Sequence, residues 1–209
     1  MSSVADRAER ARTDKFGDRR RMLAESALAA IAEHGYAQTG LRDVAQRSGL
    51  SHGSLHYYFD DKDDLVALAV WNYKSECARR YDSIVETAAD AAEFVDRIGA
   101  EMARTMSEDA TMHRLWYDLR NQALFTSGFR NTIIDIDDLL ESMVWMIVSR
   151  YAELRGGTPG VTSQVAYALV DGMFQNSLIR FLRGDHAARD RLRLEVALLL
   201  DRGTDVQAP

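Results

Sequence analysis

The chain has 209 residues, of which 46% are hydrophobic, so it is long enough to bury a full core. Its formal net charge of −6 argues against a protein that is basic over its whole surface. A single cysteine, Cys77, excludes an intramolecular disulfide and favours a reducing compartment. The charged N-terminus is unlike a secretory signal, and the longest apolar runs are far too short to span a bilayer. We therefore expect a cytoplasmic protein with no membrane partner.

The first segment, residues 1–17, is rich in arginine and is expected to form a basic, flexible N-terminal arm. Residues 1–62 hold ten Lys/Arg against nine Asp/Glu, whereas residues 63–209 hold sixteen against twenty-three. Basic arms often follow the phosphate backbone of DNA. The interspersed Asp and Glu residues fit a solvated tail equally well, so both interpretations stay open.

Two short helices joined by a tight turn are predicted after a first helix over about 18–33. Thr39 can cap the free amides at the start of the first short helix. Gly49 can take the left-handed conformation that follows a helix end, and Ser51 can cap the second short helix. Helix, turn and helix in this order predict a helix-turn-helix that binds DNA.

The second short helix has a polar exposed face. Leu55 and Phe59 lie four apart and mark its buried side, so Gly53 and Tyr57 point away from the core. Small residues permit close approach to a major groove, and His, Ser and Tyr side chains reach bases or phosphates. The predicted DNA-binding residues are Thr39, Arg42, Ser51, His52, Gly53, Ser54, His56, Tyr57, Tyr58 and Lys62.

This stretch, from about Arg19 to Leu68, resembles the TetR family of bacterial one-component repressors. His56 stands where that family most often has Tyr, at a position that commonly touches a base or phosphate, so the departure bears on which operator is bound. The resemblance implies a larger helical ligand-binding and dimerising domain in the remainder of the chain. The residues that match the family pattern are Thr39, Val44, Ala45, Ser48, Gly49, Leu50, Ser51, Gly53, Leu55, Tyr58, Phe59, Lys62 and Leu65.

Beyond the helix-turn-helix the chain predicts helices only, which makes the expected fold all-α. Few prolines interrupt it, and no alternating apolar and polar run suggests a sheet. The break from Gly156 to Gly160 is the strongest boundary. We expect a three-helix DNA-binding domain at 18–62 and a helical ligand-binding and dimerisation domain at 63–209. The helices expected in the latter span about 62–87, 92–106, 112–125, 131–154, 161–183 and 186–201.

The last two helices carry more apolar surface than one face needs. In the final helix, one stripe can pack on its own body, while a second stripe requires a partner. We expect a two-fold, four-helix homodimer interface, with burial of both stripes inside the monomer as the alternative. The predicted interface residues are Val161, Val165, Leu169, Leu192, Leu194, Val196, Leu198 and Leu199.

The central helices mix large apolar side chains with polar ones, as a small-molecule pocket requires. The run from Trp116 to Arg120 is the best cluster, although most of these residues fit a plain core as well. No cofactor and no metal are expected. The predicted ligand-binding residues are Met102, Met106, His113, Trp116, Tyr117, Arg120, Asn121, Trp145, Tyr167, Asp171, Phe174 and Gln175.

These features together predict a transcriptional repressor that binds a palindromic double-stranded DNA operator as a homodimer and is released by a small-molecule inducer. One alternative is a helical metal-binding enzyme using His52, His56 and Asp60 at four-residue spacing. A second alternative is a ligand-free DNA-binding protein, which predicts no enclosed cavity. No catalytic residue is expected, because no nucleophile motif or reactive-cysteine setting is present.

Overall fold

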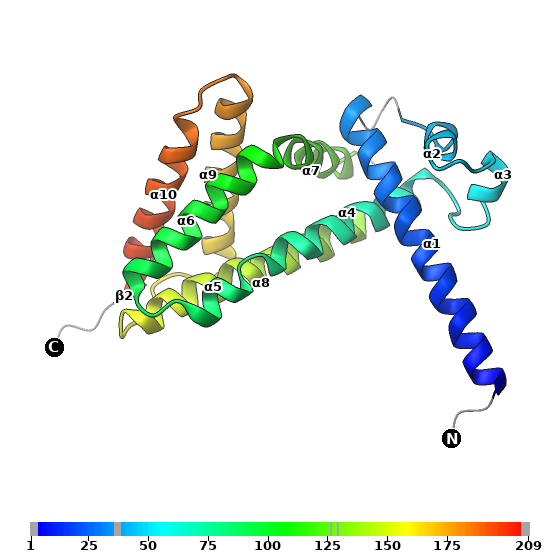
Figure 1. Ribbon diagram of the computed structural model, residues 1–209. Coiled ribbons are helices and arrows are strands. Elements are labelled where there is room, and N and C mark those ends of the chain that lie inside the picture. The colour runs from blue at the N-terminus through cyan, green and yellow to red at the C-terminus, as the bar shows by residue number, and fades with distance from the viewer. Residues whose placement is uncertain (1–3, 36–38, 126, 129, 206–209) are drawn as a thin grey trace. The chain divides into compact units, whose positions relative to one another are not determined.

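The computed structural model describes the backbone of residues 4–35, 39–125, 127–128 and 130–205, and side chains from residue 14 onward within these ranges, except that of residue 52. Over these residues the fold is all-α, apart from two strands of two residues each (Figure 1). The helices are α1 (Val4–His34), α2 (Leu41–Arg47), α3 (His52–Leu55), α4 (Lys62–Arg79), α5 (Asp82–Thr87), α6 (Ala91–Glu108), α7 (Ala110–Ala123), α8 (Arg130–Leu154), α9 (Ser163–Leu182) and α10 (Ala188–Arg202). The antiparallel strands are β1 (Thr158–Pro159) and β2 (Thr204–Asp205).

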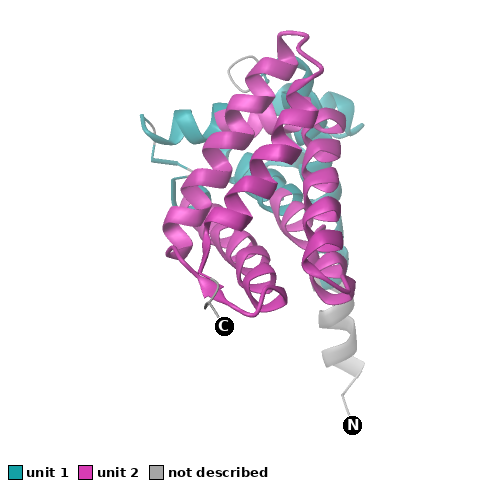
Figure 2. Ribbon diagram, turned by 90° about the vertical axis from the view of Figure 1, so that its left-hand side faces the viewer, with its two compact units in different colours: residues 1–73, 118–133 teal, residues 74–117, 134–209 magenta. Residues whose placement is uncertain are grey.

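The chain divides into two compact units, coloured separately in Figure 2. The first unit comprises residues 1–73 with 118–133, and the second comprises residues 74–117 with 134–209. The first unit therefore continues through the early turns of α4 and includes a second chain segment. The division at residue 62 that the sequence suggests stays a prediction about function, since the compact packing extends past it.

The core of the first unit holds α1, α2, α3 and the start of α4 together. Leu23 and Ala27 of α1 are buried with Val44 of α2, and with Leu55 and Phe59 from α3 and the turn after it. Residues four apart in α1 and in α4 turn one apolar side of each helix toward this common core. This packing stabilises α3, whose four residues are too few to form a helix alone.

Helix α1 begins at Val4, well before the expected start at Asp18. Residues 4–16 are mostly Ala, Arg, Glu, Asp and Lys, with no Gly or Pro to interrupt a helix. The predicted flexible arm at 1–17 is therefore helical from Val4 onward, and Gly17 and Asp18 do not mark the start of the helix. Contact of this segment with DNA stays a prediction, and its side chains before residue 14 lie outside the described part.

The core of the second unit is formed mainly by α6, α8, α9 and α10. Phe94, Ile98, Met102 and Met106 recur every four residues along α6 and are all buried. Helix α10 packs mainly against α6 and α9. A Cβ added at Gly99 would lie 3.4 Å from the Cα of Arg193, so the absence of a side chain there permits the close approach of α6 and α10.

The single long helix expected from Lys62 to about Thr87 is wrong, because α4 ends at Arg79 and α5 begins at Asp82. The amide of Arg80 bonds the carbonyl of Cys77, a tight turn that leaves the α-helical pattern. No Gly or Pro marks this break. It coincides with the Arg80 ion pair to Asp109, whose N–O distance is 2.6 Å, and with the buried ring of Tyr81.

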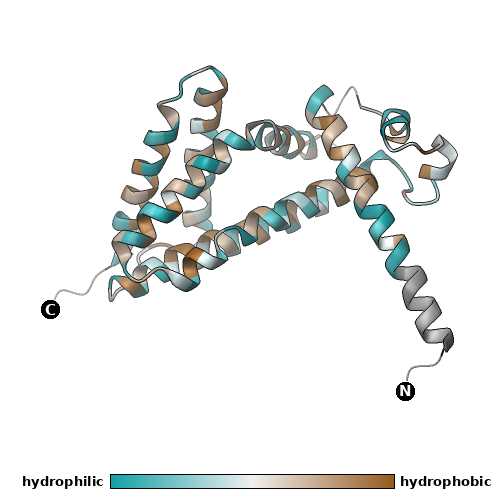
Figure 3. Ribbon diagram, viewed as in Figure 1, coloured by the Kyte–Doolittle hydropathy of each residue, from teal (hydrophilic) through white to brown (hydrophobic). Residues whose placement is uncertain are grey.

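Hydrophobic and hydrophilic residues alternate around α10 (Figure 3). Leu192, Val196 and Leu200 of this helix are buried, whereas Leu194 and Leu198 are exposed. Among the described residues, no helix combines the length and the apolar character needed to cross a membrane.

Candidate DNA-binding surface and ligand pocket

The turn between α2 and α3 is fixed by a few local contacts. Gly49 has φ +66°. The amide of Leu50 donates to the carbonyl of Ala45 at 2.9 Å, which is the hydrogen bond of the Schellman motif that ends many helices. The Ser51 hydroxyl then accepts a hydrogen bond of 3.1 Å from the amide of Ser54. These contacts set the start of α3 and therefore the direction of its exposed face.

The exposed face of α3 and the residues just after it is small and polar. Gly53, Ser54 and His56 are exposed, and the side chain of Tyr57 is 72% exposed. The Tyr57 ring meets the Tyr58 ring edge-on, with ring centroids 5.1 Å apart. This contact holds an aromatic hydroxyl at the surface while the backbone beside it stays open to close approach.

A stacked aromatic side chain and an ion pair support this face from behind. Phe16 of α1 stacks on Tyr58, with ring centroids 5.2 Å apart. Arg20 of α1 donates two hydrogen bonds to the Asp64 carboxylate at 2.9 and 3.1 Å, and its guanidinium lies 4.8 Å from the Phe59 ring centroid. The start of α4 is thereby tied to α1, the helix that packs behind the helix-turn-helix.

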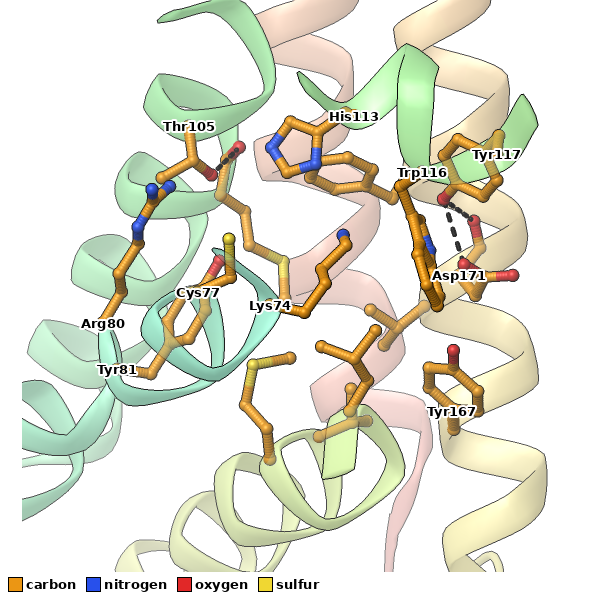
Figure 4. A pocket seen from close by; sticks show the side chains of 16 residues that line it. Lys74, Cys77, Arg80, Tyr81, Thr105, His113, Trp116, Tyr117, Tyr167 and Asp171 are labelled. Atoms are coloured by element: carbon orange, nitrogen blue, oxygen red, sulfur yellow. Dashed lines mark hydrogen bonds between the residues drawn. The ribbon is translucent and has the colours of Figure 1, made fainter. Parts of the chain in front are cut away.

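The second unit contains a pocket with a volume of about 70 Å³ (Figure 4). Aromatic and methionine side chains form about half of its wall, and polar groups enter from the α4 side and from α9. The residues lining it are Lys74, Cys77, Arg80, Tyr81, Met102, Thr105, His113, Trp116, Tyr117, Leu140, Met143, Val144, Tyr167, Val170, Asp171 and Phe174.

Positive charge is concentrated on the α4 side of the pocket. The side chain of Lys74 is only 4% exposed, and its ammonium lies 4.7 Å from the centroid of the Trp116 ring. Burial, together with the charges of Lys74 and Arg80, lowers the pKa of His113 to about 3. His113 is therefore neutral at physiological pH, and its ring packs edge-on against Phe174, with centroids 4.7 Å apart.

Two tyrosines on the opposite side of the pocket donate hydrogen bonds to carboxylates, of which Asp171 lines the pocket. The Tyr117 hydroxyl donates to the Asp171 carboxylate at 3.0 Å, as the dashed lines in Figure 4 show. The Tyr167 hydroxyl donates to the Asp137 carboxylate at 2.5 Å. These bonds fix the two half-buried rings, and a third tyrosine of the pocket, Tyr81, is buried, which raises its pKa.

The chain is similar to known bacterial transcriptional regulators. Residues 23–69 match the family described as bacterial regulatory proteins, tetR family. The HTH-type transcriptional regulator PksA of Bacillus subtilis is 26% identical over 190 residues, which is 84% of each chain. The HTH-type transcriptional repressor KstR2 of Mycobacterium tuberculosis is 25% identical over 181 residues, covering 72% of this chain and 88% of its own.

Residues 23–69 therefore match the TetR family, and the chain as a whole is similar to TetR-type transcriptional regulators. A solved TetR-family regulator from Rhodococcus sp. shares the fold with a TM-score of 0.72 at 21% identity, over 90% of this chain and all of that one. The regulator FadR of Bacillus subtilis, solved in complex with stearoyl-CoA, gives a TM-score of 0.66 at 20% identity, over 87% of this chain and 97% of FadR. The all-α fold with an N-terminal helix-turn-helix, expected from the sequence, is confirmed.

The structure places most of the predicted DNA-binding residues on one exposed stretch. Tyr58 and Lys62 are half-buried, and partial burial lowers the pKa of Lys62. The His52 side chain lies outside the described residues. The predicted residues that are exposed are Arg42, Ser51, Gly53, Ser54, His56 and Tyr57.

Thr39 is the exception in this set. Its side chain is buried, and its hydroxyl donates to the carbonyl of Gly35 at 3.0 Å. The cap of α2 is instead Gly40, whose amide donates to the Asp43 carboxylate at 2.7 Å. The expectation that Thr39 caps α2 is therefore wrong, because the hydroxyl is used to hold the end of α1 against the start of α2.

The pocket brings together many of the predicted ligand-binding residues, but not all of them. Met106 is fully buried in the core, and Trp145 packs against that core. Arg120, Asn121 and Gln175 do not line the pocket. The predicted residues that do line it are Met102, His113, Trp116, Tyr117, Tyr167, Asp171 and Phe174.

Helix α4 and the turn after it contribute four pocket residues that no pattern in the sequence indicates. Lys74, Cys77, Arg80 and Tyr81 all line the cavity. Lys74 and Cys77 lie three apart and Arg80 follows after three more, a helical spacing that marks one face. A lysine usually marks a helix face that is exposed to solvent, so the spacing alone did not predict that this face lines a cavity.

The predicted dimer residues separate into two groups. Leu192 and Val196 are buried in the monomer core, so their assignment to an interface is corrected to core packing, whereas Val161 and Leu199 are only partly buried against that core and stay predicted interface residues. The exposed apolar residues on α9 and α10 are Val165, Leu169, Ile179, Leu182, Leu194 and Leu198, and they are called the α9–α10 face below.

The metal-site alternative requires a helix that continues from His52 to Asp60. Helix α3 ends at Leu55, with His56 as its C-cap, so the four-residue spacing does not align the three side chains. Within the described ranges, no group of three or more His, Cys, Asp or Glu residues could hold a metal ion.

Proposed function

We propose that this protein is a ligand-responsive transcriptional repressor that binds a palindromic operator as a homodimer and leaves it when a small molecule occupies the pocket. The observation that carries the proposal is the exposed, small and polar face of α3, held by a buried pair, Leu55 and Phe59. Such a face permits major-groove approach, and its exposed side chains suit DNA: the Tyr57 hydroxyl can donate to a phosphate, and the His56 imidazole can hydrogen-bond a base edge.

Relatives support the regulatory role over an enzymatic one. KstR2 of Mycobacterium tuberculosis and AcnR of Corynebacterium glutamicum are both named transcriptional repressors. Structural neighbours have been solved with stearoyl-CoA and with choline, so this fold accommodates ligands of different chemistry. The pocket of this chain argues against a ligand-free DNA-binding protein.

Release of the operator requires only that the ligand bind one conformation better than the other. A preference of about 3 kcal/mol for the conformation that does not bind DNA weakens operator binding more than a hundredfold. Helix α4 connects the two functions along the chain: Lys62 to Tyr73 belong to the first unit, and Lys74, Cys77 and the turn after the helix line the pocket.

Selection from a library of randomised DNA duplexes tests the DNA-binding part. We expect an enriched palindrome whose half-sites lie about one helical turn apart or a little more. With that duplex as the probe, Tyr57→Ala should weaken binding in a gel-shift assay by about tenfold, because a phosphate contact is lost. The fold should be unchanged, since Tyr57 is exposed.

Phe125→Ala is the matched control, since Phe125 is another exposed aromatic of the first unit but lies outside the helix-turn-helix. Its operator affinity should equal that of the wild type. Wild-type affinity for Tyr57→Ala would remove this face from the DNA interface, and failure to enrich any sequence would contradict specific DNA binding altogether.

A further inference from the structure

Three aromatic side chains meet beside the exposed face of α3. Phe16 of α1 lies nearly parallel to the Tyr58 ring, with ring centroids 5.2 Å apart and an angle of 27° between the planes. Phe16 also meets the Tyr57 ring edge-on, with centroids 5.7 Å apart and an angle of 83°. Because Tyr57 and Tyr58 contact each other as well, each of the three rings touches both of the others. Stacked and edge-on pairs are both favoured arrangements of aromatic rings.

Tyr57 is exposed and yet contacted from two sides. Its side chain is 72% exposed, whereas Phe16 and Tyr58 are half-buried. An exposed tyrosine ordinarily samples several rotamers. Contacts with two neighbouring rings favour the one rotamer in which the Tyr57 ring touches both, so they limit the positions that its hydroxyl can reach.

The direction of Phe16 is set by contacts of α1 that do not involve the two tyrosines. Leu23, which is fully buried in the core of the first unit, follows Phe16 by seven residues, or nearly two helical turns. Arg20, one turn after Phe16, bonds the Asp64 carboxylate and lies over the Phe59 ring. These contacts fix the rotation of α1 about its axis, so the helix itself carries Phe16 to the tyrosine pair.

Building on the proposed function, we propose that Phe16 is a positioning residue for operator binding, which holds the Tyr57 ring in the orientation that presents its hydroxyl to a DNA phosphate. A side chain that is already fixed loses less conformational freedom when the complex forms. The phosphate contact is therefore stronger than the same contact made by a freely rotating tyrosine. Phe16 acts through Tyr57 and needs no contact of its own with DNA.

NMR of the full-length protein with isotope-labelled tyrosine tests the positioning in the absence of DNA. The Tyr57→Phe spectrum identifies the Tyr57 signals, which the ring current of Phe16 displaces from those of a free tyrosine. Phe16→Leu removes the ring but keeps an apolar side chain that favours a helix, and it should move these signals toward the free values. Phe16→Tyr keeps a ring and should leave them displaced. Unmoved Tyr57 signals in Phe16→Leu would overturn the proposal.

Gel shifts with the duplex enriched from the randomised library measure the effect on DNA binding. Phe16→Leu should weaken binding about three- to tenfold, because the Tyr57 side chain must then be ordered when the complex forms. Phe16→Tyr should bind as tightly as the wild type. Met22→Ala is the matched control, since Met22 is another exposed apolar residue of α1, and its affinity should be unchanged. Wild-type affinity for Phe16→Leu would contradict the positioning role.

A double variant shows whether Phe16 acts through Tyr57. In a protein that already carries Tyr57→Ala, adding Phe16→Leu should change operator affinity by less than about twofold, because the contact that Phe16 supports is already lost. If Phe16 only stabilised the fold, Phe16→Leu would weaken both proteins by the same factor, and the proposal would be wrong.

The same measurements separate this inference from the proposed function. Wild-type affinity for Tyr57→Ala would remove the DNA-binding face itself, and the role of Phe16 with it. A clear loss for Tyr57→Ala, combined with an equal effect of Phe16→Leu in both backgrounds, would leave the DNA-binding face standing and overturn only the role of Phe16.

Discussion

At the scale of single residues, His113 shows how the pocket controls protonation. The imidazole is buried between two cationic side chains, so its charged form is disfavoured by desolvation and by repulsion. A histidine that cannot take up a proton at pH 5 behaves as a constant polar wall across the physiological range. The pH dependence of ligand binding should then come from the ligand and not from this residue.

The same shift has a consequence for stability. The pKa of an unfolded histidine is about 6.5, and that of folded His113 is about 3, so below pH 6.5 the unfolded state takes up a proton that the folded state refuses. The free energy of unfolding should therefore fall as pH is lowered from 6.5 toward 3, by up to about 1.4 kcal/mol per pH unit from this group. His113→Gln should remove that part of the slope in urea unfolding at several pH values. A slope equal to that of the wild type would contradict the buried neutral state.

At the scale of elements, the helix-turn-helix depends on one backbone conformation. Gly49 holds φ +66°, and an added Cβ at this position would meet no atom within 4 Å. A side chain at this position would therefore cause no steric clash. Its cost would come only from the left-handed backbone conformation, which residues other than glycine disfavour. Gly53 also has open space around it, but its φ is not positive and it lies on the exposed face of α3.

The two glycines therefore predict opposite effects. Gly49→Ala should lower the free energy of unfolding by about 1–2 kcal/mol while leaving the DNA-facing surface intact. Gly53→Ala should keep or slightly raise stability, because alanine favours a helix, and yet weaken operator binding, because a methyl group then separates α3 from the groove. Thermal unfolding and gel shifts on the same two preparations measure both effects. Equal behaviour of the two variants would refute the distinction between turn and contact surface.

At the scale of the whole molecule, the α9–α10 face gathers apolar side chains that the monomer leaves exposed. Leu194 and Leu198 are 71% and 57% exposed, respectively, while the neighbouring stripe of Leu192 and Val196 fills the core. Two apolar stripes on one helix require two packing partners, and the monomer supplies one. The proposed two-fold dimer would supply the other.

Replacing Leu194 and Leu198 together with Glu should give monomers in sedimentation at micromolar concentration, because four carboxylates would face each other across a two-fold axis. Those monomers should bind the operator far more weakly, since one half-site offers too few contacts. Leu124→Glu with Phe125→Glu is the matched control, because both residues are exposed but lie in the first unit. A wild-type monomer, or a dimeric double variant of Leu194 and Leu198, would rule out this interface.

Local signals in the sequence were sufficient for the helix-turn-helix but not for the pocket. Gly49, Ser51 and the Leu55–Phe59 pair each depend on neighbours within a few residues, so their roles can be predicted from spacing. Lys74 lines the pocket only because α7 brings Trp116 to it, a contact between residues about forty positions apart that no local pattern encodes.

For the Thr39 hydroxyl and for the two apolar stripes of α10, the sequence allows two packing partners each. The hydroxyl of Thr39 was free to cap α2 or to bond the end of α1, and only the packing of α1 decides between them. In α10 the sequence predicts two apolar stripes, but which of them faces α6 is set by the close approach at Gly99. Periodicity alone therefore could not predict that Leu192 is buried and Leu194 is exposed.

The continuity of α4 has a thermodynamic consequence. Its backbone runs without interruption from Lys62 to Arg79, and Lys62 and Lys74 are about 18 Å apart at 1.5 Å per residue. Coupling between two binding events on one protein is reciprocal, so under the proposed function operator DNA would lower the affinity for the inducer by the same factor by which the inducer lowers the affinity for operator. For a repressor present well above its operator dissociation constant, the inducer concentration that empties the operator would then exceed the concentration that half-saturates the DNA-free protein. Under that condition the dissociation constant of the isolated protein for the inducer would set a lower bound on the response threshold of a gene under its control.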